Sequence, residues 1–237
     1  MRSKRRKIRK QDDPSKSKLT AFVNEKTYSP IGTNNVKKIA DAAIKILVEI
    51  GMSDAPKELS DLVLERGGKL EGNRLIFPPN LIQNTIAKHQ RVVLLAGQVL
   101  ENDLEVGGNN VYAGTGGAAP NLHNTKTNQY VPSKLKDLYD AARLADRLTN
   151  ISFFSRSLVA GDIENPLEFD LSTAAASLAG TSKHVMVQAS HWYHVTEIAA
   201  LCYKIAGGEE SFRKRPFLSL HVNHAVPPLR FDSASIK

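Results

Sequence analysis

Apolar residues in the first third of the chain recur every three or four positions, which is the spacing of one helix face. The longest such series runs from Val36 to Ile50 and is followed by Gly51, a residue type common just past a helix end. The pattern predicts helices over 36–50, 56–66 and 78–88, with a short hairpin over 69–77. These short elements predict a small N-terminal cap of helices and strands.

From residue 91 the pattern changes to short apolar runs broken by Asn and Gly, which is typical of antiparallel strands. Farther along, strand-like runs alternate with helical patterns. The expected strands cover 111–113, 151–154, 184–187 and 217–222, and the helices between them 135–145, 166–179 and 195–206. A strand followed by a helix recurs about every 30–40 residues, which is the length of a βα unit.

Two of these helices carry clear start signals. Ser133 is the expected N-cap of the first. Asn165, Pro166 and Glu168 suit the N-cap, N1 and N3 positions of the second, and Gly180 is expected just after its end.

Alternating strands and helices predict an α/β fold with a parallel sheet, either a barrel or an open doubly wound sheet. The alternation alone does not choose between the two. The pattern divides the chain into an arm over 1–18, the cap over 19–110 and the βα part over 111–237.

In both architectures, functional side chains gather at the carboxyl ends of the strands. The first loop there, Gly114 to Gly117, lacks the spacing of a dinucleotide-binding loop and the Lys-Ser/Thr pair of a phosphate-binding loop. It is therefore either a backbone cradle for a substrate carboxylate or a plain tight turn.

Arg156 is the one charged residue immediately after an expected strand. It could bind an anion, or form a salt bridge with Asp162 or Glu164. The aromatic residues near the same face could surround a methylated ammonium group or belong to the core; they are Tyr112, Phe154 and Trp192.

The histidines and the single cysteine do not indicate a metal site. His191 and His194 are three positions apart at a helix start, but no carboxylate accompanies them in a metal-binding motif. Cys202 lies on the apolar face of a helix, so a core thiol is favoured over a nucleophile. No metal is expected.

The net charge of +8 belongs to the N-terminus. Residues 1–18 carry nine Lys or Arg and two Asp, so the rest of the chain is almost neutral. Such an arm could bind nucleic acid or an acidic partner, but we expect a solvated, disordered segment. No apolar run is long enough for a membrane helix or a secretory signal, so the cytoplasm is the expected location.

Several long segments resemble the trimethylamine methyltransferase family. The resemblance covers nearly the whole chain in order and is carried by GTGGAAPNL (114–122), LKDLYDAARLADRLTNISFFSRSLVAGDIENPLEFDL (135–171), SLAGTSKHVMV (177–187) and RPFLSLHVNHAVPPLRF (215–231). It implies a (β/α)8 barrel, of which this chain would be the first half, with about four βα units. It also implies transfer of a methyl group from a methylated amine, such as trimethylamine or glycine betaine, to the cobalt of a corrinoid protein.

The resemblance implies that the corrinoid is carried by a partner protein and that this chain binds no cofactor itself. Gly114 to Gly117 and Arg156 would lie near any substrate carboxylate, with aromatic side chains near the ammonium group. No catalytic acid or base is assigned. The expected substrate-binding residues are Tyr112, Gly114, Thr115, Gly116, Gly117, Phe154, Arg156, Gln188, His221 and Asn223.

An alternative is a non-catalytic half barrel that binds a corrinoid protein or another chain. A closed barrel takes eight strands and about 250 residues. A fresh helix, with Ala234 and Ile236 in its first turn, is expected after Pro227-Pro228. An open parallel sheet leaves an unpaired strand edge, so we expect the chain on its own to be inactive and either oligomeric or poorly soluble. Size-exclusion chromatography and a methyl-transfer assay test this; an active, cooperatively melting monomer would contradict it.

Overall fold

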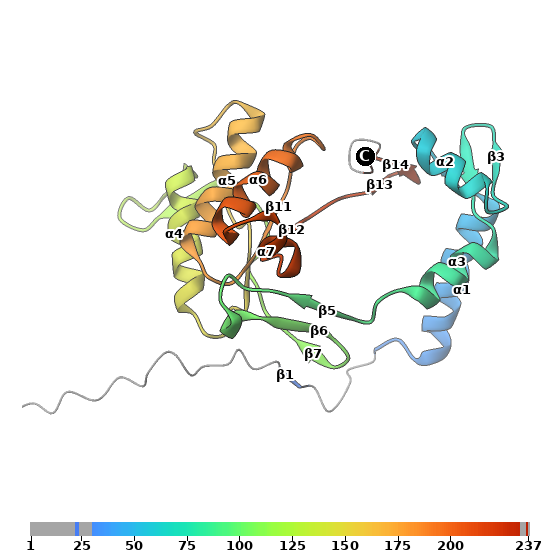
Figure 1. Cartoon of the computed structure of the whole chain (residues 1–237), viewed down its shortest axis with the longest axis horizontal. Helices are drawn as coiled ribbons and strands as arrows, with labels where there is room; N and C mark the ends of the chain where they lie inside the picture. The colour runs from blue at the N-terminus through green and yellow to red at the C-terminus, as the bar shows by residue number, and fades with distance from the viewer. Residues whose placement is uncertain (1–21, 24–29, 233–235, 237) are drawn as a thin grey trace, which may run out of the picture.

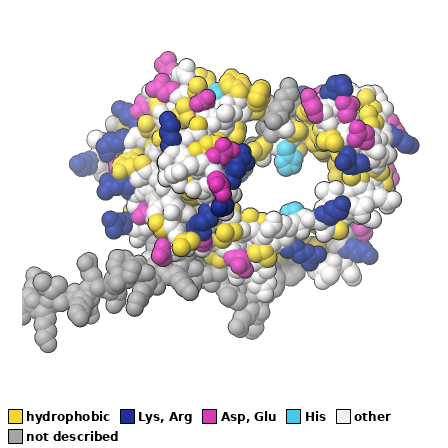
Figure 2. All heavy atoms as spheres, in the orientation of Figure 1, with side chains coloured by type: hydrophobic (Ala, Val, Ile, Leu, Met, Phe, Trp, Pro, Cys, Tyr) yellow, Lys and Arg dark blue, Asp and Glu magenta, His cyan; other side chains and the backbone are white. Residues whose placement is uncertain are grey.

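The computed structural model describes residues 22–23, 30–232 and 236. The basic arm expected over 1–18 lies outside the described residues. The described chain is a mixed α/β structure in two parts, which we call the cap and the sheet body (Figure 1). Figure 2 shows an open gap between them, bordered on the side of the sheet body by acidic and basic side chains.

The cap contains three helices and a five-stranded sheet in the order β13-β14-β2-β4-β3. Its elements are α1 (Thr33–Glu49), β2 (Met52–Ser53), α2 (Lys57–Leu64), β3 (Lys69–Glu71), β4 (Arg74–Ile76), α3 (Pro79–Lys88), β13 (Ala225–Val226) and β14 (Arg230–Phe231). The predicted helices and the β3–β4 hairpin are confirmed. Gly51 has a φ of +67°, and a Cβ there would lie 2.3 Å from the Leu75 carbonyl oxygen, so this helix end requires glycine.

Helix α1 is only partly covered by the cap. None of its residues is buried, and its apolar Val36 and Ile39 side chains are 52% and 59% exposed. The predicted apolar stripe therefore exists, but part of it faces solvent.

The hairpin β13–β14 joins the end of the described chain to the cap. β14 pairs in parallel with β2, Arg230 beside Ser53, and Pro227-Pro228 form a cis peptide in the turn before β14. The sequence predicted no strand here. Of the helix expected over 234–236, only Ile236 lies within the described residues.

A two-stranded ribbon runs between the two parts (Figure 1). Here β5 (Val92–Leu95) pairs antiparallel with β6 (Leu104–Gly107), and the short 3-10 helix η2 (Leu100–Asn102) lies between them. The predicted antiparallel patch is confirmed. The strand expected over 111–113 does not join the parallel sheet. In its place β7 (Asn110–Val111) pairs antiparallel with β1 (Phe22–Val23) in a separate two-stranded sheet.

The sheet body is built on three parallel strands, β10 (Phe153–Ser155), β11 (His184–Val187) and β12 (Leu218–Leu220), in that order. Along β10 and the residues after it the described chain forms isolated parallel bridges, Gly114 with Phe153 and Ala119 with Leu158, in a stretch where glycines and Pro120 disfavour a regular strand. The remaining elements are the hairpin β8 (Asn121–Asn124) and β9 (Gln129–Pro132), and the helices α4 (Leu135–Arg147), α5 (Pro166–Gly180), α6 (His194–Ala206) and α7 (Glu209–Lys214).

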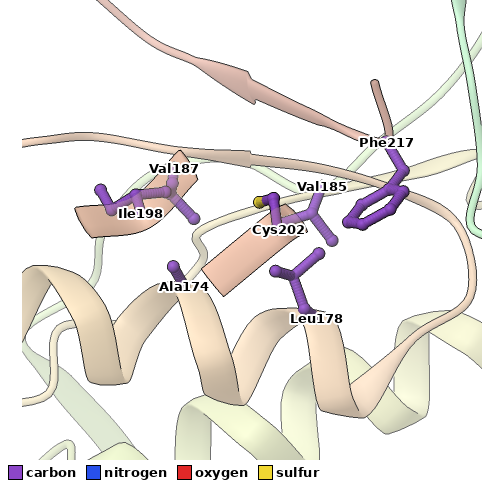
Figure 3. Close-up of a cluster of buried hydrophobic side chains, with 7 residues drawn as sticks. All are labelled: Ala174, Leu178, Val185, Val187, Ile198, Cys202 and Phe217. Carbon is purple, nitrogen blue, oxygen red and sulfur yellow. The ribbon is translucent and has the colours of Figure 1, made fainter. Parts of the chain in front are cut away.

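Two apolar clusters hold the helices of the sheet body against its strands. The first is drawn in Figure 3 and contains Ala174, Leu178, Val185, Val187, Ile198, Cys202 and Phe217. The second contains Leu138, Ala142, Ala145, Phe154 and Leu158. The three long helices are therefore confirmed, and Cys202 lies in the core as expected.

Two predictions at the helix ends were wrong. Lys134, not Ser133, is the N-cap of α4; Ser133 is buried, and its hydroxyl donates to the Val159 carbonyl oxygen at 2.7 Å. Gly180 is the last residue of α5 rather than the residue after it. A Cβ there would lie 2.5 Å from that of Ala142, so close packing of α4 on α5 explains the glycine.

Within the described ranges the strands form separate sheets, and none closes into a barrel. In the same ranges no helix is long and apolar enough to cross a bilayer.

Candidate functional site

A cavity of about 510 Å³ lies at the carboxyl ends of β10, β11 and β12. Sites for small ligands in α/β proteins occupy this position and have volumes of about 300–1,000 Å³. The cavity is lined by Arg156, Phe169, Gln188, Ala189, Ser190, His191, Trp192, Val195, Leu220, His221, Val222, Asn223 and Asp232.

Arg156 follows β10 and enters this cavity. Its backbone N–H donates to the Met186 carbonyl oxygen at 3.0 Å, which extends the pairing with β11 by one residue. Its guanidinium donates to Gln188 Oε1 at 2.8 Å and lies 5.5 Å from the ring centroid of Phe169. Burial lowers the pKa of Arg156, and the negative charge of Asp170 opposes that shift.

A buried carboxylate fixes the loop between β11 and α6. Asp170 on α5 is 1% exposed. It accepts hydrogen bonds from the Ser190 backbone N–H at 2.6 Å, the Ser190 hydroxyl at 2.9 Å and His194 Nδ1 at 2.6 Å. Because the same loop carries Gln188 and Trp192, Asp170 sets the position of one wall of the cavity.

The wall of the cavity after β12 is polar, whereas its mouth exposes an aromatic ring. The His221 backbone N–H donates to the Val187 carbonyl oxygen at 2.8 Å, so β12 positions His221 and Asn223. At the start of α6, Trp192 is 54% exposed. The polar wall is therefore ordered by the sheet, and an indole ring stands exposed on the opposite loop.

The structure brings together four of the ten predicted substrate-binding residues. Arg156, Gln188, His221 and Asn223 all line the cavity, as does the aromatic Trp192. The alternative for Arg156, a salt bridge with Asp162 or Glu164, does not form among the described residues. Asp162 instead accepts the Leu135 N–H at 2.8 Å.

The other six predicted residues do not line this cavity; they are Tyr112, Gly114, Thr115, Gly116, Gly117 and Phe154. Phe154 is fully buried in the second apolar cluster. The Thr115 hydroxyl donates to the Ser155 carbonyl oxygen at 2.6 Å, which fastens the glycine loop to β10. A Cβ on Gly114 would lie 2.3 Å from the Phe153 ring, so close packing accounts for this glycine.

A family model for trimethylamine methyltransferase matches residues 1–237. The chain belongs to this family. It is similar to a trimethylamine methyltransferase of Desulfitobacterium hafniense, with 22% identity over 211 residues, covering 88% of this chain and 40% of that protein. It is also similar to a glycine betaine methyltransferase of the same species, with 22% identity over 210 residues, covering 86% of this chain and 42% of that protein.

A trimethylamine methyltransferase of Methanosarcina barkeri is 26% identical over 196 residues, covering 79% of this chain and 39% of that protein. The chain of this family member therefore spans about two fifths of the length of the curated relatives it matches.

The buried side chains of His184 and Cys202 have structural positions. His184 is buried between the Ala96 carbonyl oxygen, 2.8 Å from its Nδ1, and the Ser219 hydroxyl, 2.7 Å from its Nε2; burial lowers its pKa. Cys202 lies in the first apolar cluster, where burial raises the pKa of its thiol to about 11. Among the described residues, no group of three or more side chains could hold a metal ion.

Sequence reasoning missed Phe169, Asp170, Ser190 and Asp232. One signal was present for Asp170, which lies four positions before Ala174 on the inward face of α5. A carboxylate on an apolar helix face is costly unless it is hydrogen-bonded, so its partners could have been sought in the following loop.

Proposed function

We propose that the protein transfers a methyl group from a methylated amine to the cobalt of a corrinoid carried by a separate cytoplasmic protein. The family match over residues 1–237 carries this proposal. The names of the relatives supply the donor class, since they act on trimethylamine and glycine betaine.

The cavity at the strand ends supports binding of such a donor. Its lining combines polar groups with the indole of Trp192, a ring that attracts methylated ammonium groups. A quaternary amine leaves as a neutral tertiary amine once a methyl group is removed, so that reaction needs no acid or base. The residues of this chain would orient the donor and exclude water from it.

The corrinoid is the methyl acceptor and approaches as a substrate. The cavity opens beside Trp192 and Tyr193, which are 54% and 51% exposed. Exposed aromatic residues of this kind are enriched at protein interfaces. The mouth therefore suits an incoming protein partner, and the corrinoid would supply the nucleophilic metal there.

We further propose that the parallel strands are the first part of a barrel that additional polypeptide completes. β12 pairs only with β11 among the described residues, so one edge of the parallel sheet is open. The alternative, a non-catalytic chain that binds a corrinoid protein or another polypeptide, is favoured by the exposed Val36 and Ile39 of α1.

Methyl transfer is tested with the complete protein, a reduced corrinoid partner and a set of methylated amines. We expect the absorption spectrum of the corrinoid to change to that of the methylated form without S-adenosylmethionine. A strict requirement for S-adenosylmethionine would contradict the proposal. Binding of the corrinoid protein without methylation by any amine would favour the non-catalytic alternative.

A further inference from the structure

Helix α1 has two apolar faces, and the rest of the cap covers one of them. The helix packs against β4 and α3, and its half-buried residues are Ile44, Leu47 and Val48. The second face is a continuous stripe in which every side chain is exposed; it consists of Val36, Ile39, Ala43, Ile46 and Ile50. Figure 1 shows α1 at the end of the molecule opposite to the sheet body, which therefore does not cover this stripe.

The exposed stripe has the spacing of a helix-pairing seam. Its members follow one another at intervals of three, four, three and four residues, as the a and d positions of a coiled coil do. They span about 21 Å along the helix at 1.5 Å per residue. Ala40 and Ala42 flank the central Ala43, so the backbone of another helix can approach closely there, with the two axes about 8 Å apart. The stripe therefore fits a second helix.

The stripe is nearly symmetric about Ala43. Val36 and Ile50 each lie seven residues from Ala43, and Ile39 and Ile46 lie four and three residues from it. A second α1 that runs in the opposite direction, related by a two-fold axis at Ala43, would place Val36 against Ile50 and Ile39 against Ile46. The small alanines would meet at the axis, and the larger side chains would pack on both sides of it.

The charged residues beside the stripe favour the same antiparallel arrangement. Lys38 and Glu49 are eleven residues apart, which is about three helical turns, so both lie on one flank of the stripe. A two-fold axis across two antiparallel helices brings this flank of each helix together. Lys38 of each copy then lies beside Glu49 of the other, and both side chains belong to exposed residues. The antiparallel helix dipoles add to this attraction.

We propose that α1 is a dimerisation helix, through which two copies of this chain form an antiparallel, two-fold symmetric pair. An interface between identical subunits about a two-fold axis must be self-complementary. The stripe meets this condition in the order of its large and small residues and in the placement of Lys38 and Glu49. The inference goes beyond the proposed function and does not depend on it.

Cysteine cross-linking of the chain tests the position of the axis. Ala43→Cys should form a disulfide-linked dimer under mild oxidation, because the two Cβ atoms at the axis lie within disulfide reach. Asp41→Cys is the matched control, since Asp41 is exposed on the side of α1 away from the stripe. The native Cys202 is fully buried, so it does not contribute a cross-link.

Charge reversal, followed by sedimentation velocity over a range of concentrations, tests whether the partner is a second copy. Lys38→Glu and Glu49→Lys should each raise the dimer dissociation constant about 3- to 10-fold, because each puts like charges together twice in the dimer. The double variant should regain the original constant. Lys37→Glu is the control: it changes the net charge as Lys38→Glu does but lies on the far side of α1, so it should have no effect.

A chain that stays monomeric, or that cross-links equally through Ala43→Cys and Asp41→Cys, would overturn the inference. So would a double variant that dimerises no better than the single ones, because that result would indicate a different polypeptide on this face. Circular dichroism verifies that the variants, all of exposed residues, remain folded. Methyl transfer is measured separately, and its presence or absence does not change these outcomes.

Discussion

Replacing Lys183 with methionine is expected to lower the free energy of unfolding by about 3–5 kcal/mol. Lys183 is 3% exposed, and its ammonium group donates to the carbonyl oxygens of Ala145, Leu148 and Ile151 at 2.7, 2.8 and 2.6 Å. These carbonyls belong to the end of α4 and the turn into β10. Methionine would fill the space but leave all three acceptors without this donor.

Lys183 also places its positive charge at the carboxyl end of α4, where the helix dipole favours a positive charge. Burial lowers the pKa of Lys183, and the nearby carboxylate of Asp146 opposes that shift. Asp146 in turn accepts from the Ser182 backbone N–H at 2.8 Å and the Thr181 hydroxyl at 2.9 Å. The substitution therefore loosens a network that joins α4 to the start of β11.

Urea denaturation of the variant gives the measurement, with Lys136→Met as the matched control. Lys136 lies on α4, but its side chain is 80% exposed and, among the described residues, pairs with Asp140 alone on the surface. Its loss should change the free energy of unfolding by about 0.5 kcal/mol or less. A similar small change for both variants would show that the three carbonyl contacts of Lys183 contribute little.

Local signals made much of the fold predictable. The start of α5 follows from Asn165, whose side chain accepts the Glu168 backbone N–H at 3.0 Å as its N-cap position suggests. The hairpin β8–β9 was missed because its strands are polar and exposed, with Tyr130 78% exposed, so no apolar alternation marks them. The pairing of Arg230 with Ser53 joins distant parts of the chain, and no local pattern reports such a contact.

Residues of the candidate site were predictable from the sequence where they directly follow the end of a strand. Arg156, Gln188 and His221 follow strand ends directly, and parallel strands bring such residues to one edge. Phe154 was expected near the substrate, with a core position as the alternative; its side chain lies in the second apolar cluster, because alternate residues of a strand point to opposite faces of the sheet. The contacts of Asp170 span 20 and 24 residues, so they depend on how α5 packs beside α6.

The Asp170→Asn substitution is expected to lower the free energy of unfolding by about 2–4 kcal/mol and to weaken binding of the proposed methylated-amine donor at least about tenfold. The buried carboxylate accepts all three of its hydrogen bonds from Ser190 and His194. An amide has one acceptor oxygen, so at least one of these donors loses its partner. Because the same loop holds Gln188 against Arg156 at 2.8 Å, the cavity wall should move with it.

Hydrogen exchange separates this loop effect from a general loss of stability. The Ser190 amide should lose protection by more than the global change accounts for, while amides in α4 follow the global change. Asp140→Asn is the control, since Asp140 is 45% exposed and, within the described part of the chain, forms ion pairs with Lys136 and Arg143 alone, on the surface. It should change neither exchange at Ser190 nor ligand binding. Unchanged protection of Ser190 in Asp170→Asn would mean that the loop holds its position without the carboxylate, and that Arg156 and Gln188 are placed by the strands alone.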